Sequence, residues 1–355
     1  MKTVSSVHSV VGGLAIALLA TAAPGPVAAA DDFYAKHKLT VLIGTPVGGS
    51  YDLMGRLTAR HIVKYIPGKP SVIVKNMPGG GSLIATNYLN NVAPQDGSVL
   101  GCVVPGIILT ALFKDSTARY NPAKMQWIGN AMDGSPVAVA FHTSPYKTLD
   151  DMKKHQALVA SSGISGFDAM DPMMYNALIG TKFKIVMGYK GGAGMDLSLE
   201  RGETQIRAAQ AWSGWKAIHP DWVRDKKIIP FLQLTLEPID DPLLKGVPRF
   251  IDVVKAEDRA LAESYTVLPN MGRPTVMAPG VPKERVAAMR AAYAAMVKDS
   301  DFIAEANKQR IALKPIVGEK LQKMVETVYN LDQAQAKRLY KILQWDKRGR
   351  KKKKK

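Results

Sequence analysis

The chain reads Thr45-Pro46-Val47-Gly48-Gly49-Ser50-Tyr51-Asp52 between a run typical of a strand and a pattern typical of a helix. The strand candidate is 39–45, and within 51–65 the residues Met54 and Leu57 fall on one helical face. Ligands of open α/β sheets bind beyond the carboxyl ends of the strands, where turns of this kind lie. This turn therefore indicates both a fold class and a place for a site.

Two more glycine-rich turns have the same setting. Residues 76–82 read N-M-P-G-G-G-S and residues 188–194 read G-Y-K-G-G-A-G, each between a predicted strand and a predicted helix. Main-chain N–H groups in such turns can approach an anion, and the helix N-terminus adds partial positive charge. The residues alone leave two interpretations open, an anion cradle or a set of tight connections.

The alternation of strands and helices predicts the fold class. Helical patterns separate further strand-like runs, which are 71–75, 99–104, 136–141, 157–161, 183–189, 227–236 and 275–278. Such alternation predicts an α/β fold with mostly parallel sheets flanked by helices. The last third is expected to be mostly helical, with helices in 282–297, 319–329 and 332–343, and to pack back on the first domain.

The first thirty residues have the order of a secretory signal peptide. Lys2 is followed by an apolar run at 10–20, by prolines, and by the cleavage pattern Ala28-Ala29-Ala30. The apolar run is short for crossing ~30 Å of hydrocarbon. Cleavage near Ala30 takes 30 of the 355 residues and leaves 325, a length that fits about two domains. We therefore expect a soluble protein of the periplasm.

Cys102 is the only cysteine, so no internal disulfide can form. It lies in the apolar run 99–104, where a small buried core role is expected rather than that of a nucleophile.

The net charge of +18 has two sources. The last nine residues carry eight positive charges, and the rest of the chain therefore carries +10. A moderately basic body favours encounter with anionic solutes. The segment 346–355 is expected to be a disordered basic tail. No basic stripe with interleaved aromatic residues is present, so a nucleic-acid partner is not expected.

Enzyme and cofactor motifs are missing from the sequence. It contains no G-x-G-x-x-G, no phosphate loop and no G-x-S-x-G elbow. The histidines are scattered without the spacing of metal ligands. We therefore expect no catalytic residues, no metal and no cofactor.

Several motifs, in one order along the chain, resemble a known family. Residues 45–56 are similar to the P-x-G-G-x-x-D-x-x-x-R signature of the tripartite tricarboxylate transporter receptors, the TctC or Bug family. The segments 74–81, 93–97, 189–192 and 278–282 resemble the family's V-x-N-x-P-G-A-G, A-x-x-D-G, Y-K-G-G and A-P-x-x-P motifs. Together they cover most of the chain that follows Ala30.

The resemblance implies a periplasmic solute-binding receptor with two lobes of the type II kind and a hinge. Lobe one would comprise 31–139 and 270–345, and lobe two 140–269. A small organic carboxylate would lie between the lobes, and integral membrane transporter subunits would receive it. The receptor is expected to be a monomer. A secreted enzyme on the same fold and a ligand-presenting sensor are the alternatives.

The resemblance also nominates the site. One carboxylate would be held by the first turn and by the Y-K-G-G turn. The residues nominated are Val47, Gly48, Gly49, Ser50 and Asp52, with Asn76 and Gly79 behind them, and from lobe two Ser161, Ser162, Gly163, Tyr189, Gly191 and Gly192. We expect Asp52 to orient its loop, or to accept a donor from the ligand, rather than to touch the ligand's carboxylate.

Two further residues have side chains whose chemistry suits an organic acid. Trp212 is assigned to the cleft wall, although a core position is an equal alternative. A surface position near the hinge is expected for Arg273, and a role as carboxylate clamp is the alternative. The segments 199–203, 211–215 and 271–274 depart from the family pattern, so the sequence does not identify the ligand.

Overall fold

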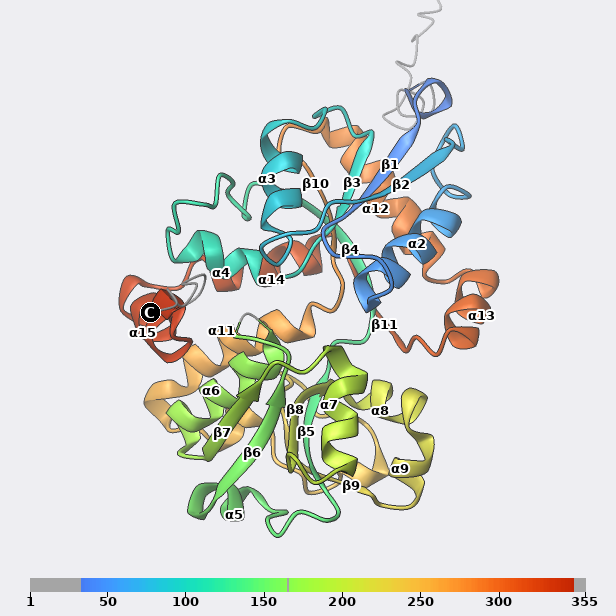
Figure 1. The fold of residues 1–355 in the computed structure, drawn as a ribbon. Coiled ribbons are helices and arrows are strands. Elements are labelled where there is room, and N and C mark those ends of the chain that lie inside the picture. Colours follow the sequence, from blue (N-terminus) through green and yellow to red (C-terminus); the bar gives the residue numbers. More distant parts are fainter. Residues whose placement is uncertain (1–32, 165, 348–355) are drawn as a thin grey trace, which may run out of the picture.

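The computed structural model describes residues 33–164 and 166–347 (Figure 1). The expected signal peptide at 1–30 and tail residues 348–355 lie outside the described residues. Two β-sheets, each flanked by helices, lie one above the other in the view of Figure 1. The predicted α/β class with helix-flanked sheets is confirmed.

The first sheet has six strands in the order β11-β4-β10-β3-β1-β2. Their bounds are Leu39–Ile43 for β1, Val72–Asn76 for β2, Val99–Cys102 for β3, Gln126–Met132 for β4, Thr275–Met277 for β10 and Leu313–Val317 for β11. β1 is parallel to β2 and β3, whereas β10 is antiparallel to β3 and β4, and β11 is antiparallel to β4.

The second sheet has five strands in the order β7-β6-β8-β5-β9. Their bounds are Pro136–Phe141 for β5, Gln156–Ser161 for β6, Lys182–Met187 for β7, Ile206–Ala211 for β8 and Ile228–Gln233 for β9. β6 is parallel to β7 and β8, and β5 is antiparallel to β8 and β9. Both sheets are therefore mixed, because β5, β10 and β11 oppose their neighbours.

The chain passes from the first sheet to the second between Met132 and Pro136. β4 runs in the same direction as β1, β2 and β3, so the carboxyl ends of all four face this crossing. β5 starts at the crossing and opposes the other strands of its sheet, so their carboxyl ends face it as well. The turns that follow strands in both sheets therefore meet at one boundary. The proposed limits of the lobes at 139/140 and 269/270 stay a prediction.

Helices cover the sheets on both sides. The longer ones are α2 (Ser50–Ile62), α3 (Leu83–Asn91), α6 (Phe167–Ile179), α7 (Gly191–Glu200), α11 (Arg259–Asn270), α12 (Lys283–Met296), α13 (Ser300–Lys308), α14 (Glu319–Tyr329) and α15 (Gln333–Ile342). The shorter ones are α4 (Ile107–Leu112), α5 (Leu149–Lys154), α8 (Trp212–Ile218), α9 (Pro220–Arg224) and α10 (Phe250–Val253). As predicted, α12 and α14 pack on the first sheet, against β4, whereas α15 contacts α6.

Three strands were absent from the sequence-based prediction. β4 contains Gly129 and Asn130 and is buried along most of its length, so it lacks an alternating pattern. β8 contains Arg207, which is 2% exposed because Asp196 pairs with it at 2.9 Å (Nε to Oδ1). β11 contains Pro315, which an edge strand tolerates.

Cys102 has the expected core position. It lies on β3, is 2% exposed, and burial raises the pKa of its thiol to about 12. Within 33–164 and 166–347, no helix combines the length and the apolar character that crossing a bilayer requires.

The packing of β4 yields a test of the fold. A Cβ added at Gly129 would lie 2.5 Å from a ring carbon of the buried Tyr293. We expect Gly129→Ala to lower the free energy of unfolding by about 1–3 kcal/mol, the usual cost of overpacking. Gly163→Ala is the control, because no atom lies within 4 Å of its added Cβ. Chemical denaturation that finds the two variants equally stable would contradict this packing.

Candidate functional site

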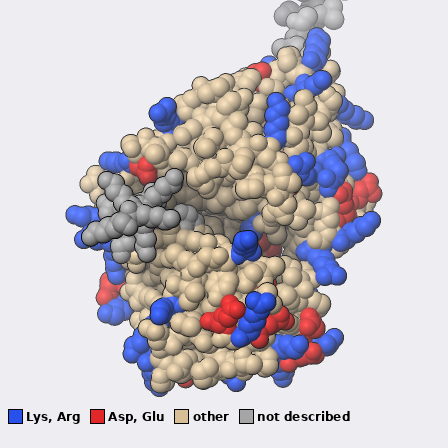
Figure 2. Space-filling view, viewed as in Figure 1, with Lys and Arg blue, Asp and Glu red and all other residues tan. Residues whose placement is uncertain are grey.

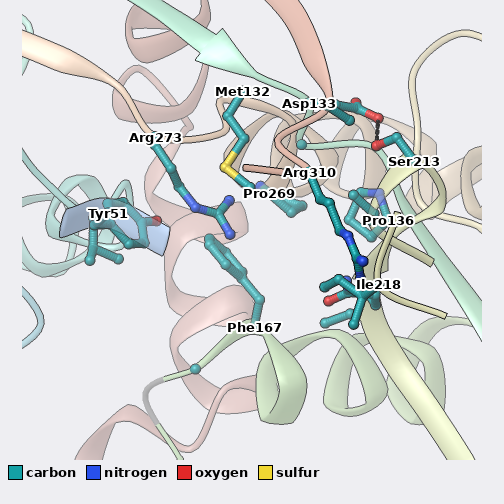
Figure 3. Close-up of a pocket in the computed structure, with 18 residues that line it drawn as sticks. Tyr51, Met132, Asp133, Pro136, Phe167, Ser213, Ile218, Pro269, Arg273 and Arg310 are labelled. Atoms are coloured by element: carbon teal, nitrogen blue, oxygen red, sulfur yellow. Dashed lines mark hydrogen bonds between the residues drawn. The ribbon is translucent and has the colours of Figure 1, made fainter. Parts of the chain in front are cut away.

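A cavity of about 260 Å³ lies at the boundary between the two sheets (Figure 3). Figure 2 shows the surface hollowed between the upper and lower parts of the molecule. The wall contains residues from the first sheet's layer, from the crossing between the sheets, from the second sheet's layer and from the end of α11. The lining residues are Tyr51, Val104, Met132, Asp133, Gly134, Pro136, Gly166, Phe167, Ala209, Gln210, Ala211, Ser213, Gly214, Ile218, Pro269, Arg273, Arg310 and Ala312.

The first glycine-rich turn joins β1 to α2, as predicted, and Asp52 holds its shape. Asp52 Oδ2 accepts from the Gly48 N–H at 3.0 Å, while Oδ1 accepts from Arg56 Nε at 3.0 Å and from Asn76 Nδ2 at 2.9 Å. Asn76 Nδ2 also donates to the Thr45 carbonyl at 3.0 Å. Asp52 thus orients the loop, as expected, and Asn76 connects it to the end of β2.

The same hydrogen bonds control the charge of Asp52. Burial alone would raise the pKa of this carboxyl, but donation from Gly48, Arg56 and Asn76 outweighs burial and holds the pKa below its usual value. Asp52 is therefore an anion in the folded protein, and the protein itself supplies the donors that its carboxylate accepts from.

Gly48 and Gly49 differ in backbone conformation. Gly48 has φ +91°, in the region that favours glycine, whereas Gly49 has φ −88°. Gly49 therefore has a backbone conformation that other residues can adopt. No atom lies within 4 Å of a Cβ placed at Gly49, so the position is open to solvent or to a ligand.

The second turn supports the first one. Buried Ser82 donates from Oγ to the Gly44 carbonyl at 3.0 Å and accepts from the Val104 N–H at 3.1 Å. Gly79 has φ +137° and packs beside Ile84. This turn therefore braces the ends of β1 and β3, and Gly79 is absent from the cavity wall.

The nominated residues of the second sheet form one connected group. The Ser161 carbonyl accepts from the N–H groups of Gly188 and Tyr189 at 3.1 and 3.2 Å. Ser162 donates to Asp168 Oδ2 from its N–H and from its hydroxyl, at 2.7 and 2.6 Å. The Gly163 N–H donates to Ser161 Oγ at 3.2 Å. The Y-K-G-G turn is thereby fastened to the end of β6.

Other groups at this turn point elsewhere. The Tyr189 hydroxyl donates to Glu203 at 3.3 Å, and the Gly191 N–H donates to the Tyr189 carbonyl at 3.1 Å. Gly191 has φ +66°. Gly192 is exposed, and Arg207 Nη2 lies 3.8 Å from a Cβ placed there. The residues nominated from sequence do not line the cavity. They lie on the turns around the boundary, and their ligand contacts stay a prediction.

Trp212 is a correction to the sequence-based site. It is 2% exposed and belongs to a small cluster with Trp215, Trp222 and Phe141. Its indole N–H donates to Asp241 at 2.8 Å. The core alternative therefore holds, because helix α8 turns Trp212 into the second sheet's layer and leaves its neighbours Ala211 and Ser213 at the cavity.

Arg273 lies in the cavity wall. Its Nε donates to Ser50 Oγ at 3.1 Å, and its guanidinium lies 4.9 Å from the centroid of the Tyr51 ring. Its N–H donates to Asn130 Oδ1 at 2.7 Å. Gly272 has φ +65° and leaves no room for a Cβ beside Met132 and Asn130. Three contacts, with Ser50, Tyr51 and Asn130, therefore fix the side chain and backbone of Arg273 beside the first turn.

Among the residues of the cavity wall, Arg310, Phe167 and Met132 were not predicted from the sequence. Arg310 precedes β11, and because no strand was predicted there, no sequence pattern indicated that Arg310 lies near the boundary. The signal that could have found it is strand direction. β10 and β11 oppose β4, so their amino ends lie at the boundary, and Arg273 and Arg310 precede those ends.

The wall has an uneven distribution of charge. Within the part of the chain that the structure describes, neither Arg273 nor Arg310 forms an ion pair with a carboxylate. Asp133, also in the wall, accepts from the Ser213 hydroxyl and from the Ser135 N–H. No cluster of three or more potential metal ligands occurs among the described residues. The cavity is therefore suited to an anion.

The comparisons with known proteins bear on the fold. No family model and no curated protein matches the chain. A TctC solute-binding protein from Polaromonas, solved without ligand, matches with 18% identity over 87% of this chain and 99% of its own, at a TM-score of 0.66.

Two ligand-bound structures from Rhodopseudomonas palustris match at the same 18% identity. Rpa4515 with adipate covers 87% of this chain and 98% of its own, at a TM-score of 0.59. MatC with bound malate covers 87% and 99%, at a TM-score of 0.55. The chain thus has the fold of the TctC-type periplasmic binding proteins, which confirms the fold that the resemblance implied.

The hydrogen bonds of Asp52 predict a pH-dependent stability. Because the folded pKa lies below the unfolded one, Asp52 stabilises the fold above the unfolded value and loses this effect as the pH falls through the folded pKa. We expect Asp52→Asn to cost ~1.5–3 kcal/mol at neutral pH, and the difference from wild type to shrink toward about pH 3. Denaturation curves at both pH values measure this. An equal cost at both would show that the charge of Asp52 is unimportant.

Proposed function

We propose that this chain is a periplasmic receptor that captures a small organic carboxylate between its two lobes and delivers it to integral membrane transporter subunits. The observation that carries the proposal is Arg273, a cation in the cavity wall that Ser50 and Tyr51 hold in place. A fixed guanidinium without a carboxylate partner is suited to binding a carboxylate in a bidentate geometry.

The fold supports the proposal, since two proteins with the same fold hold adipate and malate. The basic body of the chain favours encounter with an anion. We also propose that the protein is a monomer, that it acts in the periplasm, and that it catalyses no reaction. Among the described residues, no histidine lines the cavity to act as a base for Ser213.

The available main-chain donors define how a ligand would be held. Helices α2, α6 and α7 have no side-chain cap, so some of the N–H groups at their starts are available to an anion. Gly48 already donates to Asp52, and Gly191 donates to Tyr189. Among the described residues, no acceptor is assigned to the N–H groups of Gly49 and Gly192. These two positions are the proposed main-chain contacts.

Binding would proceed without a covalent step. The anion meets the open cleft, and the N–H groups and Arg273 replace its water. Each hydrogen bond to a charged group contributes ~1.5–3 kcal/mol net, so a few of them could hold a solute at micromolar levels. Contacts from both lobes then favour closure about the hinge, and the transporter subunits recognise the closed form.

The first test concerns Arg273. We expect Arg273→Gln to weaken carboxylate binding about 10- to 100-fold, because ~1.5–3 kcal/mol of charge-assisted hydrogen bonding is lost. Arg273→Lys should recover only part of the affinity, since an ammonium cannot bind in a bidentate geometry. Calorimetry with the best acid from a thermal-shift screen measures this. Arg224→Gln, which removes the same charge on α9 outside the cavity, is the control.

Equal affinities for the Arg273→Gln variant and wild type, with both folded by circular dichroism, would refute the clamp. A screen in which mono-, di- and aromatic carboxylates all fail to stabilise wild type would refute the receptor function.

The second test concerns the turns. Gly49→Val adds a side chain in open space at an ordinary φ, and Gly192→Val does so with only Arg207 nearby. We expect both variants to fold and to bind at least about tenfold more weakly, because the added side chain covers an N–H that the ligand needs. Gly192 is chosen rather than Gly191 because the φ of +66° at Gly191 would strain any side chain. Normal binding by both variants would place the ligand away from the turns.

A further inference from the structure

Arg310 is a second cation in the cavity. It follows α13 with φ +56°, and its N–H donates to the Asn307 carbonyl at 2.9 Å. Arg310 is exposed, and within 33–164 and 166–347 no carboxylate forms an ion pair with it. A cation that lines a cavity without a partner is available to a ligand.

Arg310 and Arg273 lie on two sides of one space. Figure 3 shows the two side chains on different sides of the cavity, with Phe167 beside the end of Arg273, Pro269 between the two arginines and Ile218 beside the end of Arg310. Arg273 is fixed by Ser50, Tyr51 and Asn130, whereas no side-chain hydrogen bond is assigned to Arg310 in the described structure. The cavity thus presents one fixed and one adjustable cation, separated by apolar groups.

The charges set a condition on the ligand. When water leaves the cleft, a like-charged pair of guanidinium groups is unfavourable unless anions compensate both of them. Asp133 is the carboxylate of the wall, and it already accepts from Ser213 and Ser135. An acid with a single carboxylate would compensate the positive charge of Arg273 and leave the positive charge of Arg310 uncompensated. An acid with an anionic group at each end would compensate both, with its carbon chain against Phe167 and Pro269.

We propose that Arg310 selects for a second, distal anionic group on the ligand. This inference rests on the proposed receptor function. It assigns the two ends of the ligand different roles, because fixed Arg273 would set the position of the first carboxylate and adjustable Arg310 would reach the second. Chain length would therefore be tolerated more widely than the loss of the second charge.

The test compares diacids with their monomethyl esters. Succinate, glutarate, adipate and pimelate, each with its monomethyl ester, are titrated by calorimetry into wild type and into Arg310→Gln. We expect wild type to bind the best diacid at least about tenfold more tightly than its ester, and Arg310→Gln to lose that advantage while it binds the ester within about twofold of wild type. Arg310→Lys should keep part of the preference.

The control is Lys308→Gln. Lys308 ends α13 two residues before Arg310, is exposed, and lies outside the cavity wall, so this variant removes one positive charge without touching the site. It should keep the diacid preference. Equal loss in both variants would show a general charge effect and overturn the assignment of Arg310.

Two other results would refute the role of Arg310, and a third result would refute both proposals. If wild type binds monoesters as tightly as diacids, or if Arg310→Gln weakens both to the same extent, the role of Arg310 is refuted and the receptor function stands. If wild type binds none of the diacids or esters, and no acid of the thermal-shift screen, both proposals fail.

Discussion

The direction of the strands is the constraint on which the site depends. β4 ends at Met132 and β5 begins at Pro136, so a short crossing places the carboxyl end of β4 close to the amino end of β5. The carboxyl ends of the parallel strands in both sheets face this crossing, and the antiparallel β10 and β11 begin there. Turns with open N–H groups and two arginines consequently gather around one cavity, although they are far apart in the sequence.

The arrangement also explains why the loops keep their shapes without a ligand. Asp52 fastens the first turn, Ser82 braces it from the second, and the Ser161 carbonyl holds the Y-K-G-G turn. Asn130 and Gly272 do the same for Arg273. Groups that are already held lose little freedom on binding, which lowers the cost of association. In contrast, no side-chain hydrogen bond holds Arg310 in the described part of the chain, so its guanidinium can adjust to a ligand.

Much of the fold could be predicted from the sequence. The turns at 45–52, 76–82 and 188–194 carry strand, glycine and helix signals within a few residues, and each was found between its strand and helix. β4, β8 and β11 were missed because their burial depends on partners distant in sequence, such as Tyr293 for Gly129 and Asp196 for Arg207.

The cavity wall was harder to predict for the same reason. Arg310 owes its position to β11, and Phe167 owes its position to the first turn of α6. Trp212 had an aromatic ring suited to a ligand, but the direction of α8 buries it beside Asp241. Residue patterns within a few positions therefore predicted the turns. The wall between the turns depends on strand order and helix direction, which such local patterns do not predict.

We propose that the boundary at the strand ends holds a carboxylate against Arg273. A crystal structure of the protein with the tightest-binding acid from a carboxylate screen tests it most directly. We predict density for a carboxylate within hydrogen-bond distance of the Arg273 guanidinium and close to the Gly49 N–H. Density for the acid elsewhere on the molecule, with Arg273 still on Ser50 and the cavity filled only by water, would contradict the account.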